Sequence, residues 1–429
     1  MHRLLFLIAL VAAAGLPPAG PHLWAQALPP AGDFIQPTTT VASGDHGGMF
    51  FGHPPNLPHT RRYYIAAEPV VWDFLPSGRD EVCGNSIPPT IAANREQPML
   101  RYVQYTDATF TRKVPANPSL GILGPVLRGV VGDYLAVTFL NRTNQPLSLH
   151  PHGVHYDKDS EGAYYQPMPG KGAAVAPGAR FTYVWQLDES SGPLPGEPSS
   201  KAWLYHSHVN NDAETNLGLI GLIIVTDPRR ARPDGTPSDV DREFATLFMI
   251  FDTTAPGPVP PPTAAALAPG DAAGALLLAR AKAAANQPAA PPKGSADEQA
   301  ATEAGQRFAI NGRIYGNLPG LEMNEGERVR WYLLDLGSES DLHTPHWHGV
   351  RLLENGVRRT DVMELLPATM KVADLVADNP GSWLFHCHVA EHMNGGMFAR
   401  FVIYPHDAVG ADRSPAHAFL GFPLPLLLP

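Results

Sequence analysis

Four short histidine-rich stretches decide the fold. The most informative is WLFHCHV at residues 383–389, and the others are HTPHWHG at 343–349, LHPHG at 149–153 and YHSH at 205–208. Each stretch contains two histidines separated by one residue. In an extended strand alternate side chains share one face, so both histidines of a pair point the same way. The four pairs therefore predict strands whose eight imidazoles can hold one cluster of metal ions.

The rest of the 429-residue chain favours the same architecture. Its 46 prolines and 40 glycines suit many short strands joined by turns better than long helices. Runs rich in β-branched and aromatic residues recur along the chain. They are residues 63–67, 70–74, 135–140, 181–185, 219–225, 244–251, 328–334, 372–376 and 398–404. We predict an all-β fold of two Greek-key β-sandwich domains, at residues 61–228 and 240–405.

Four other segments are predicted to lie outside the sandwiches. Residues 1–27 combine a short positive end, a short apolar run and an A-x-A site, which is typical of a signal peptide. Residues 28–60 form a His-containing arm, read as a flexible segment or as a metal scavenger. Residues 254–306 are an Ala/Pro-rich surface insertion, and the tail at 406–429 is too short and proline-broken to span a membrane. We expect an exported protein, periplasmic or secreted.

Charge and cysteine content narrow the function further. The formal net charge is −10, so no basic face is available overall for nucleic acid. The two cysteines, Cys83 and Cys387, could pair in an oxidising compartment. The histidines around Cys387 instead indicate a metal ligand, which leaves Cys83 as a small buried thiol.

Cys387 points to the opposite strand face from the histidines beside it. His343 precedes His346 by three residues, so it is expected on the same side as Cys387. His392 and Met397 follow closely enough for a loop to return them to that side. Two histidines, one cysteine and a weak axial methionine make a blue-copper electron-transfer site. This set disfavours Mg, Ca or Mn, and a zinc site would not call for eight clustered imidazoles.

The two sites together predict a redox enzyme. Cys387 lies between His386 and His388, so short covalent paths join a one-electron copper to a histidine-held cluster. Three coppers in that cluster suit the four-electron reduction of O2 to water, with electrons from a small reducing substrate. Protons must also arrive, and Asp157, Asp159 and Glu161, just after His152, are candidate carriers. The alternative for Glu161 is a solvated loop charge.

These residues resemble the multicopper oxidases, in particular the ceruloplasmin and hephaestin branch and the two-domain small laccases. The resemblance covers roughly residues 61–404 apart from the insertion. It is carried by residues 62–67, 309–321, 341–344 and 383–389. It implies two cupredoxin-like sandwiches and four coppers per chain, one of type 1, one of type 2 and two of type 3.

The resemblance also implies how the ligands are shared among the coppers. The type 1 copper would take His343, Cys387, His392 and Met397. The type 2 copper would take His150 and His346. One type 3 copper would take His152, His206 and His388, and the other His208, His348 and His386.

Assembly and substrate also follow from the resemblance. In two-domain relatives the first domain of one chain meets the second domain of the next, and a head-to-tail interface that closes gives a ring. We therefore expect a homotrimer with a trinuclear cluster at each chain-to-chain interface.

The ceruloplasmin branch has an iron site of carboxylates and one histidine beside the type 1 copper. Glu303, Glu391 and, from a neighbouring chain, Glu339 occupy its carboxylate positions, whereas Phe308 stands where the family has its histidine. Carboxylate oxygens can still attract Fe2+ or Mn2+. Phenolic donors stay open as well, and solvated surface charge is the alternative for the three glutamates.

Two other functions compete with an oxidase. A copper nitrite reductase would carry its type 1 cysteine in the first domain, where this chain has Ser207. A non-catalytic copper store would favour many thiolate or thioether ligands for Cu(I), whereas the chain has two Cys and ten Met. We rank both below the oxidase.

Overall fold

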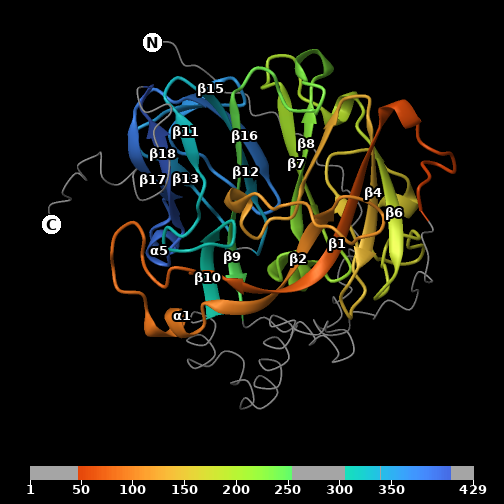
Figure 1. Ribbon diagram of the computed structural model, residues 1–429, viewed down its shortest axis with the longest axis horizontal. Coiled ribbons are helices and arrows are strands. Elements are labelled where there is room, and N and C mark those ends of the chain that lie inside the picture. The colour runs from red at the N-terminus through yellow and green to blue at the C-terminus, as the bar shows by residue number, and fades with distance from the viewer. Residues whose placement is uncertain (1–46, 254–304, 339, 407–429) are drawn as a thin grey trace, which may run out of the picture. The chain divides into compact units, whose positions relative to one another are not determined.

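A computed structural model describes residues 47–253, 305–338 and 340–406 (Figure 1). Outside these ranges lie the predicted signal peptide, most of the arm, most of the Ala/Pro-rich insertion and the tail after His406. Among the described residues, no helix is long and apolar enough to cross a membrane. Strands dominate, which confirms the predicted all-β class.

The first sandwich pairs two four-stranded sheets. One sheet has the order β2 (Glu96–Tyr105), β1 (Thr60–Asp73), β4 (Tyr134–Asn141) and β6 (Arg180–Gln186). The other has the order β3 (Val126–Val130), β8 (Ile220–Thr226), β7 (Ser200–His206) and β5 (His150–Pro151). The runs predicted at 135–140, 181–185 and 219–225 are strands with ends within one residue, whereas the runs at 63–67 and 70–74 form the single strand β1.

The second sandwich is built the same way. Its six-stranded sheet has the order β10 (Gln306–Ile310), β9 (Arg242–Asp252), β12 (Arg328–Asp335), β16 (Met370–Val376), β14 (Leu352–Glu354) and β15 (Arg358–Thr360). The four-stranded sheet has the order β11 (Glu322–Asn324), β18 (Phe398–Tyr404), β17 (Gly381–Cys387) and β13 (Pro345–Trp347), seen together in Figure 1.

Helices are short and lie between strands. The α-helices of the described residues are α1 (Pro89–Ala93), α2 (Asn211–Asn216) and α5 (Ala390–Asn394). The 3-10 turns are η1 (Leu57–His59), η2 (Pro118–Leu120), η3 (Lys158–Ser160), η4 (Glu189–Ser191) and η5 (Pro228–Arg230). Helices α2 and α5 follow β7 and β17 closely, so each comes just after one of the histidine pairs.

Each sandwich has its own core because strand side chains alternate between faces. Trp185 and Tyr205 are buried in the first core, and Trp331, Trp347 and Phe385 in the second. Full burial of such a side chain contributes about 1.5–3 kcal/mol. The alternation places the odd-numbered residues of β17 inside and leaves the even-numbered ones on the outer face of the sheet.

A third apolar cluster joins the two sandwiches. It packs the outer face of β7 and β8 against the outer face of β9, β12 and β16. Leu204 and Leu222 lie on one side, and Leu247 and Tyr332 on the other. The second sandwich therefore contacts the first mainly through its six-stranded sheet, although Phe398 of β18 also belongs to the cluster.

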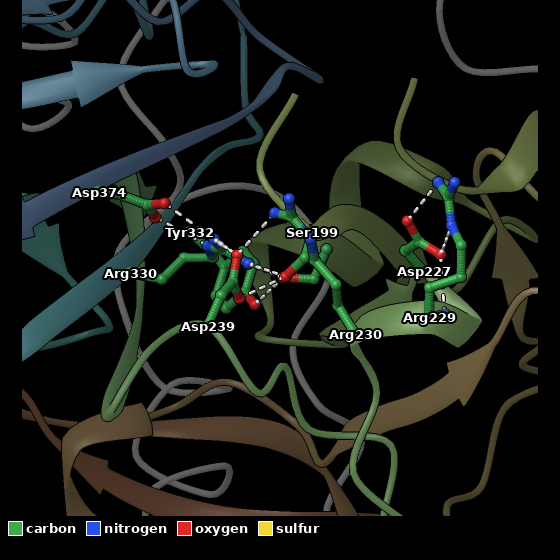
Figure 2. Close-up of polar contacts among 9 residues, drawn as sticks. Ser199, Asp227, Arg229, Arg230, Asp239, Arg330, Tyr332 and Asp374 are labelled. Carbon is green, nitrogen blue, oxygen red and sulfur yellow. Dashed lines mark hydrogen bonds and ion pairs between the residues drawn. The ribbon is translucent and has the colours of Figure 1, made fainter. Parts of the chain in front are cut away.

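Polar groups reinforce this contact (Figure 2). The fully buried Arg330 binds Asp374 through two hydrogen bonds of 2.7 and 2.8 Å, and Asp239 at 3.2 Å. The same guanidinium donates to the hydroxyls of Ser199 and Ser200 in the first sandwich, at 2.9 and 2.7 Å. Arg330 thus ties both sandwiches and the segment between them.

The structure contradicts one expectation, because Cys83 is exposed. It lies in a turn where the amides of Val82 and Cys83 donate to the Asp80 carboxylate, at 3.0 and 2.8 Å. The turn directs the Cys83 side chain outward, so the thiol lies at the surface.

Candidate metal centres

Three donor atoms converge beneath β17 in the second sandwich. Cys387 Sγ lies 3.8 Å from His343 Nδ1 and 3.6 Å from His392 Nδ1, and the two nitrogens are 3.1 Å apart. All three residues are buried. An ion at the centre of a trigonal set with bonds of about 2.1 Å needs donors about 3.6 Å apart. The donor set and its spacing fit a copper of the blue type.

Strand geometry and a short loop bring these residues together. Cys387 ends β17 and faces the core, while His392 lies on α5 five residues later. The loop then returns, and the Cys387 amide donates to the Met397 carbonyl at 3.0 Å. Met397 is fully buried in the same core cluster as Cys387. Burial raises the pKa of the Cys387 thiol, while the Thr344 amide, which donates to Cys387 Sγ at 3.4 Å, acts in the other direction and favours the thiolate.

A carboxylate missed by the sequence analysis orients His343. Asp341 Oδ1 lies 3.2 Å from His343 Nε2 and accepts the Ile250 amide at 2.7 Å. A partner on one ring nitrogen fixes which nitrogen is free for a metal. Asp335 lies nearby, and burial together with the charge of Asp341 raises its pKa to about 9. Only the D-x-H spacing at 341–343 could have signalled this support.

The first sandwich carries its own histidine set. His150 pairs with His206 across β5 and β7, and His152 Nε2 lies 3.0 Å from His206 Nε2. His208 packs against His150 with ring centroids 5.0 Å apart. Burial lowers the pKa of His152 to about 4 and that of His206 to about 3. His152 and His206 are therefore neutral at pH 7, as metal ligands must be.

The second sandwich carries the matching set. His346 pairs with His386 across β13 and β17, and His386 Nε2 lies 3.2 Å from both His346 Nδ1 and His348 Nε2. His388 packs against His346 at 5.2 Å. His386 Nδ1 contacts the Cys387 carbonyl at 2.8 Å, which leaves its Nε2 free for a metal. His348 and His388 are exposed.

The two sets do not meet within the chain. All eight histidines lie in the described residues, and the ring contacts and candidate metal groups found there stay within one set or the other. The reason is topological. The second set lies on the outer face of the β11-β18-β17-β13 sheet, whereas the second sandwich contacts the first mainly through its other sheet.

Glu161 lies beside the first set. Its backbone carbonyl contacts His150 Nδ1 at 2.7 Å, which directs the other ring nitrogen of His150 into the set. Its carboxylate binds Lys158 and accepts the Tyr165 hydroxyl at 2.9 Å. The structure places the proposed proton carrier next to the histidines, with its carboxylate engaged by two other side chains.

Of the three proposed substrate-metal glutamates, Glu391 lies on α5 and is exposed. Glu303 and Glu339 lie outside the described residues. Phe308 packs on His392 with ring centroids 5.2 Å apart and planes tilted by 32°. An apolar ring therefore covers one side of a proposed type 1 ligand.

Comparison with known proteins agrees with this geometry. Two family models described as multicopper oxidase match residues 103–230 and 289–407. The chain belongs to the multicopper oxidase family. It is 33% identical over 362 residues to Ferroxidase HEPHL1 of Mus musculus, 34% over 371 residues to human Hephaestin, and 33% over 363 residues to rat Ceruloplasmin. Each match covers 80% of this chain but only 29–32% of the relative.

Solved structures of the family share the fold. One titled as a multicopper oxidase has a TM-score of 0.50 at 20% identity and covers 84% of this chain and 94% of its own. The Blue Copper Oxidase from Nitrosomonas europaea has a TM-score of 0.50 at 18% identity and covers 81% of this chain and 87% of its own. These likenesses bear on the fold alone, and they agree with the predicted cupredoxin-like sandwiches.

Proposed function

We propose that this protein is an oxidase that couples one-electron oxidation of a reducing substrate to the four-electron reduction of O2 to water. The observation that carries the proposal is the buried trigonal set of Cys387, His343 and His392, next along β17 to the His386 and His388 pair. Four coppers per chain would be held as follows. Type 1 takes His343, Cys387, His392 and Met397, and the eight remaining histidines take one type 2 and two type 3 ions.

When bound, copper would supply single-electron transfer at the Cys387 site and O2 reduction at the site formed by the eight histidines. Cys387 does two things for that chemistry. Its side chain faces the core and its backbone continues directly into His386 and His388 on the outer face, so the two sites are joined by short covalent paths. Asp341 holds His343 in orientation, and the Glu161 carbonyl does the same for His150.

Separation of the two histidine sets supports assembly as a homotrimer. Each set offers four imidazoles, and neither can complete a three-copper site alone. The exposed His348 and His388 leave the second set open on its outer face. A head-to-tail ring would bring the first set of one chain against the second set of the next, because heterologous contacts that close form rings.

The surroundings of His392 suggest two classes of electron donor. Exposed Glu391 can attract Fe2+ or Mn2+, while Phe308 on His392 suits a phenolic ring. Relatives named as ferroxidases support testing Fe2+ first, with phenols alongside it. We also propose that the protein is exported to the periplasm or outside the cell, because residues 1–27 have the pattern of a signal peptide.

Complementation between two inactive variants tests the proposal. His206→Ala removes a ligand from the first set and His388→Ala one from the second, so each variant alone should consume no O2. In co-expressed rings, an interface is intact only where the two wild-type halves meet, which is about one interface in four. Recovery of roughly a quarter of wild-type O2 consumption is expected. No recovery in rings shown to be mixed would contradict a cluster shared between chains.

Copper content and the visible spectrum separate the oxidase from its rivals. Four coppers per chain with intense blue absorption are expected. Two coppers per chain would favour the nitrite reductase, and copper binding without O2 consumption would favour a store. In the first sandwich Ser207 stands where a nitrite reductase would need its cysteine, which disfavours the former.

A further inference from the structure

The two sandwiches repeat the same connections around their histidine pairs. His150 pairs with His206 as His346 pairs with His386. The Ser207 amide donates to the Leu219 carbonyl at 3.2 Å, and the Cys387 amide donates to the Met397 carbonyl at 3.0 Å. By this correspondence Ser207 occupies the place of Cys387, and Leu219 that of Met397.

The correspondence extends to the two type 1 histidines. Leu147 bridges to Val175 as His343 bridges to Leu365. The amide of Leu219 donates to the Glu214 carbonyl at 3.1 Å, as the amide of Met397 donates to the His392 carbonyl at 3.0 Å. Leu147 therefore replaces His343, and Glu214 replaces His392. The first sandwich contains the outline of a type 1 site without its ligands.

Polar contacts fill that outline. Glu214 is 2% exposed, and its carboxylate accepts the Ser207 hydroxyl and the Val209 amide, the latter at 3.0 Å. Ser207 Oγ in turn accepts the Ser148 amide at 3.0 Å, and Ser148 Oγ accepts the His208 amide at 3.0 Å. The network links the stretch that ends in His150 and His152 to the stretch that carries His206 and His208.

We propose that Glu214 is a positioning residue of the first histidine set, which holds its two H-x-H stretches in register through Ser207 and Ser148. In the second sandwich the matching stretches meet at a candidate metal site, because His343 from one stretch and Cys387 from the other both contribute donors to it. In the first sandwich the hydrogen-bonded Glu214 carboxylate holds the two stretches together without a metal. This inference rests on the proposed function, because the set it organises is the proposed oxygen-reducing site.

The charge of Glu214 matters for this role. Its three donors are the Ser207 hydroxyl and the amides of Val209 and Asn210, and they favour the ionised form. Burial acts more strongly in the other direction and raises the pKa of Glu214 to about 7. Tyr102 on β2 is a titratable neighbour, and the charge of Glu214 helps burial to raise its pKa. No ion pair to Glu214 occurs among the described residues. Near neutral pH the Glu214 carboxyl is therefore close to its titration point.

Glu214→Gln tests the proposal with little change in volume. The amide nitrogen cannot accept a hydrogen bond, so one of the three donors loses its partner. The exposed Glu189, also in the first sandwich, supplies the matched control Glu189→Gln. Both variants are purified as the full chain, loaded with copper and checked by thermal unfolding. Glu214→Ala serves as a second variant that removes the acceptor altogether.

Three measurements are compared with wild type. They are the copper per chain, the anaerobic rate of blue-centre reduction, and O2 consumption as a function of pH. We expect blue-centre reduction to be unchanged and O2 consumption or cluster copper affinity to fall about 10–100-fold. The advantage of wild type over Glu214→Gln should be present above the pKa of about 7 and lost below it. Glu189→Gln should match wild type throughout.

Two results would overturn the inference. One is a Glu214→Gln protein that keeps its cluster copper and consumes O2 within threefold of the control at every pH. The other is a variant that loses only thermal stability while the pH profile stays unchanged, because that is a structural effect alone. Absence of blue copper and O2 consumption in wild type would instead defeat the proposed function, so the two failures are distinguishable.

Discussion

Replacing Arg330 by methionine tests how strongly the two sandwiches are joined. The guanidinium is fully buried and makes hydrogen bonds to Asp374, Asp239 and two serine hydroxyls (Figure 2). Burial lowers the pKa of Arg330, but the hydrogen bonds and charge of Asp374 outweigh burial and raise it above its ordinary value. The neighbours of Arg330 thus stabilise its charged form.

The magnitude follows from what is left behind. Removing one partner of a buried ion pair costs about 3–5 kcal/mol, because the other charge stays desolvated. The side chains of Asp374 and Asp239 are 29% and 24% exposed, so water can reach both. We therefore expect Arg330→Met to lower the free energy of unfolding by about 3 kcal/mol, the lower end of that range. Methionine keeps the apolar contacts of the arginine stem.

Urea unfolding of the metal-free protein measures this change. Arg229→Met is the matched control, because Arg229 also pairs with an aspartate but its side chain is 82% exposed. The pair with Asp227 lies beside the buried network in Figure 2, and we expect no measurable loss from breaking it. A loss for Arg330→Met no larger than that for the control would refute the argument that the buried network joins the sandwiches.

Three further changes have defined outcomes. Cys387→Ser should abolish the blue absorption while changing the stability of the metal-free protein by less than about 1 kcal/mol, because a serine hydroxyl can still accept the Thr344 amide; retained blue colour would disprove thiolate ligation. Asp341→Asn removes a negative charge beside His343, so a redox titration of the blue absorption should show a potential raised by about 60 mV, a tenfold change in a one-electron equilibrium. Folding raises the pKa of Glu214 from 4.5 to about 7, so the protonated carboxyl stabilises the folded protein at low pH. This stabilisation is lost as the pH rises from 4.5 to about 7. In urea unfolding, the free energy of unfolding of wild type should fall by about 3 kcal/mol relative to that of Glu214→Gln between pH 4.5 and about 7. If the two proteins show the same pH dependence, folding does not raise the pKa of this carboxyl.

Much of the fold and of the candidate type 1 site was predictable from sequence because both rest on local alternation. The runs at 181–185 and 398–404 are strands in the structure, and the parity argument that put Cys387 opposite His386 is confirmed by their faces on β17. Such patterns need only neighbouring residues. The prediction that Cys83 is buried was wrong. The surroundings of this thiol are set by a turn that Asp80 holds, and not by a run of apolar residues.

Other features depended on contacts between distant segments. Asp341 supports His343 by accepting the amide of Ile250, which is 91 residues away, and no local pattern announces that pairing. Glu214 lies on the short helix α2, and no sequence pattern singled it out. Only the return of the chain at Leu219 buries it beneath Ser207. Arg330 likewise becomes a junction because two sheets pack face to face.

The sequence by itself thus determined the all-β class and the donor types, because strand alternation and ligand chemistry are local properties. Tertiary structure decided which donors meet within one chain. It gathers Cys387, His343 and His392 into one trigonal set, yet it keeps the two sets of four imidazoles on different sheets. The physical reason is that apolar burial decides which sheets pack together, and here the sheet that carries the second set is not the one that supplies most of the contact with the first sandwich.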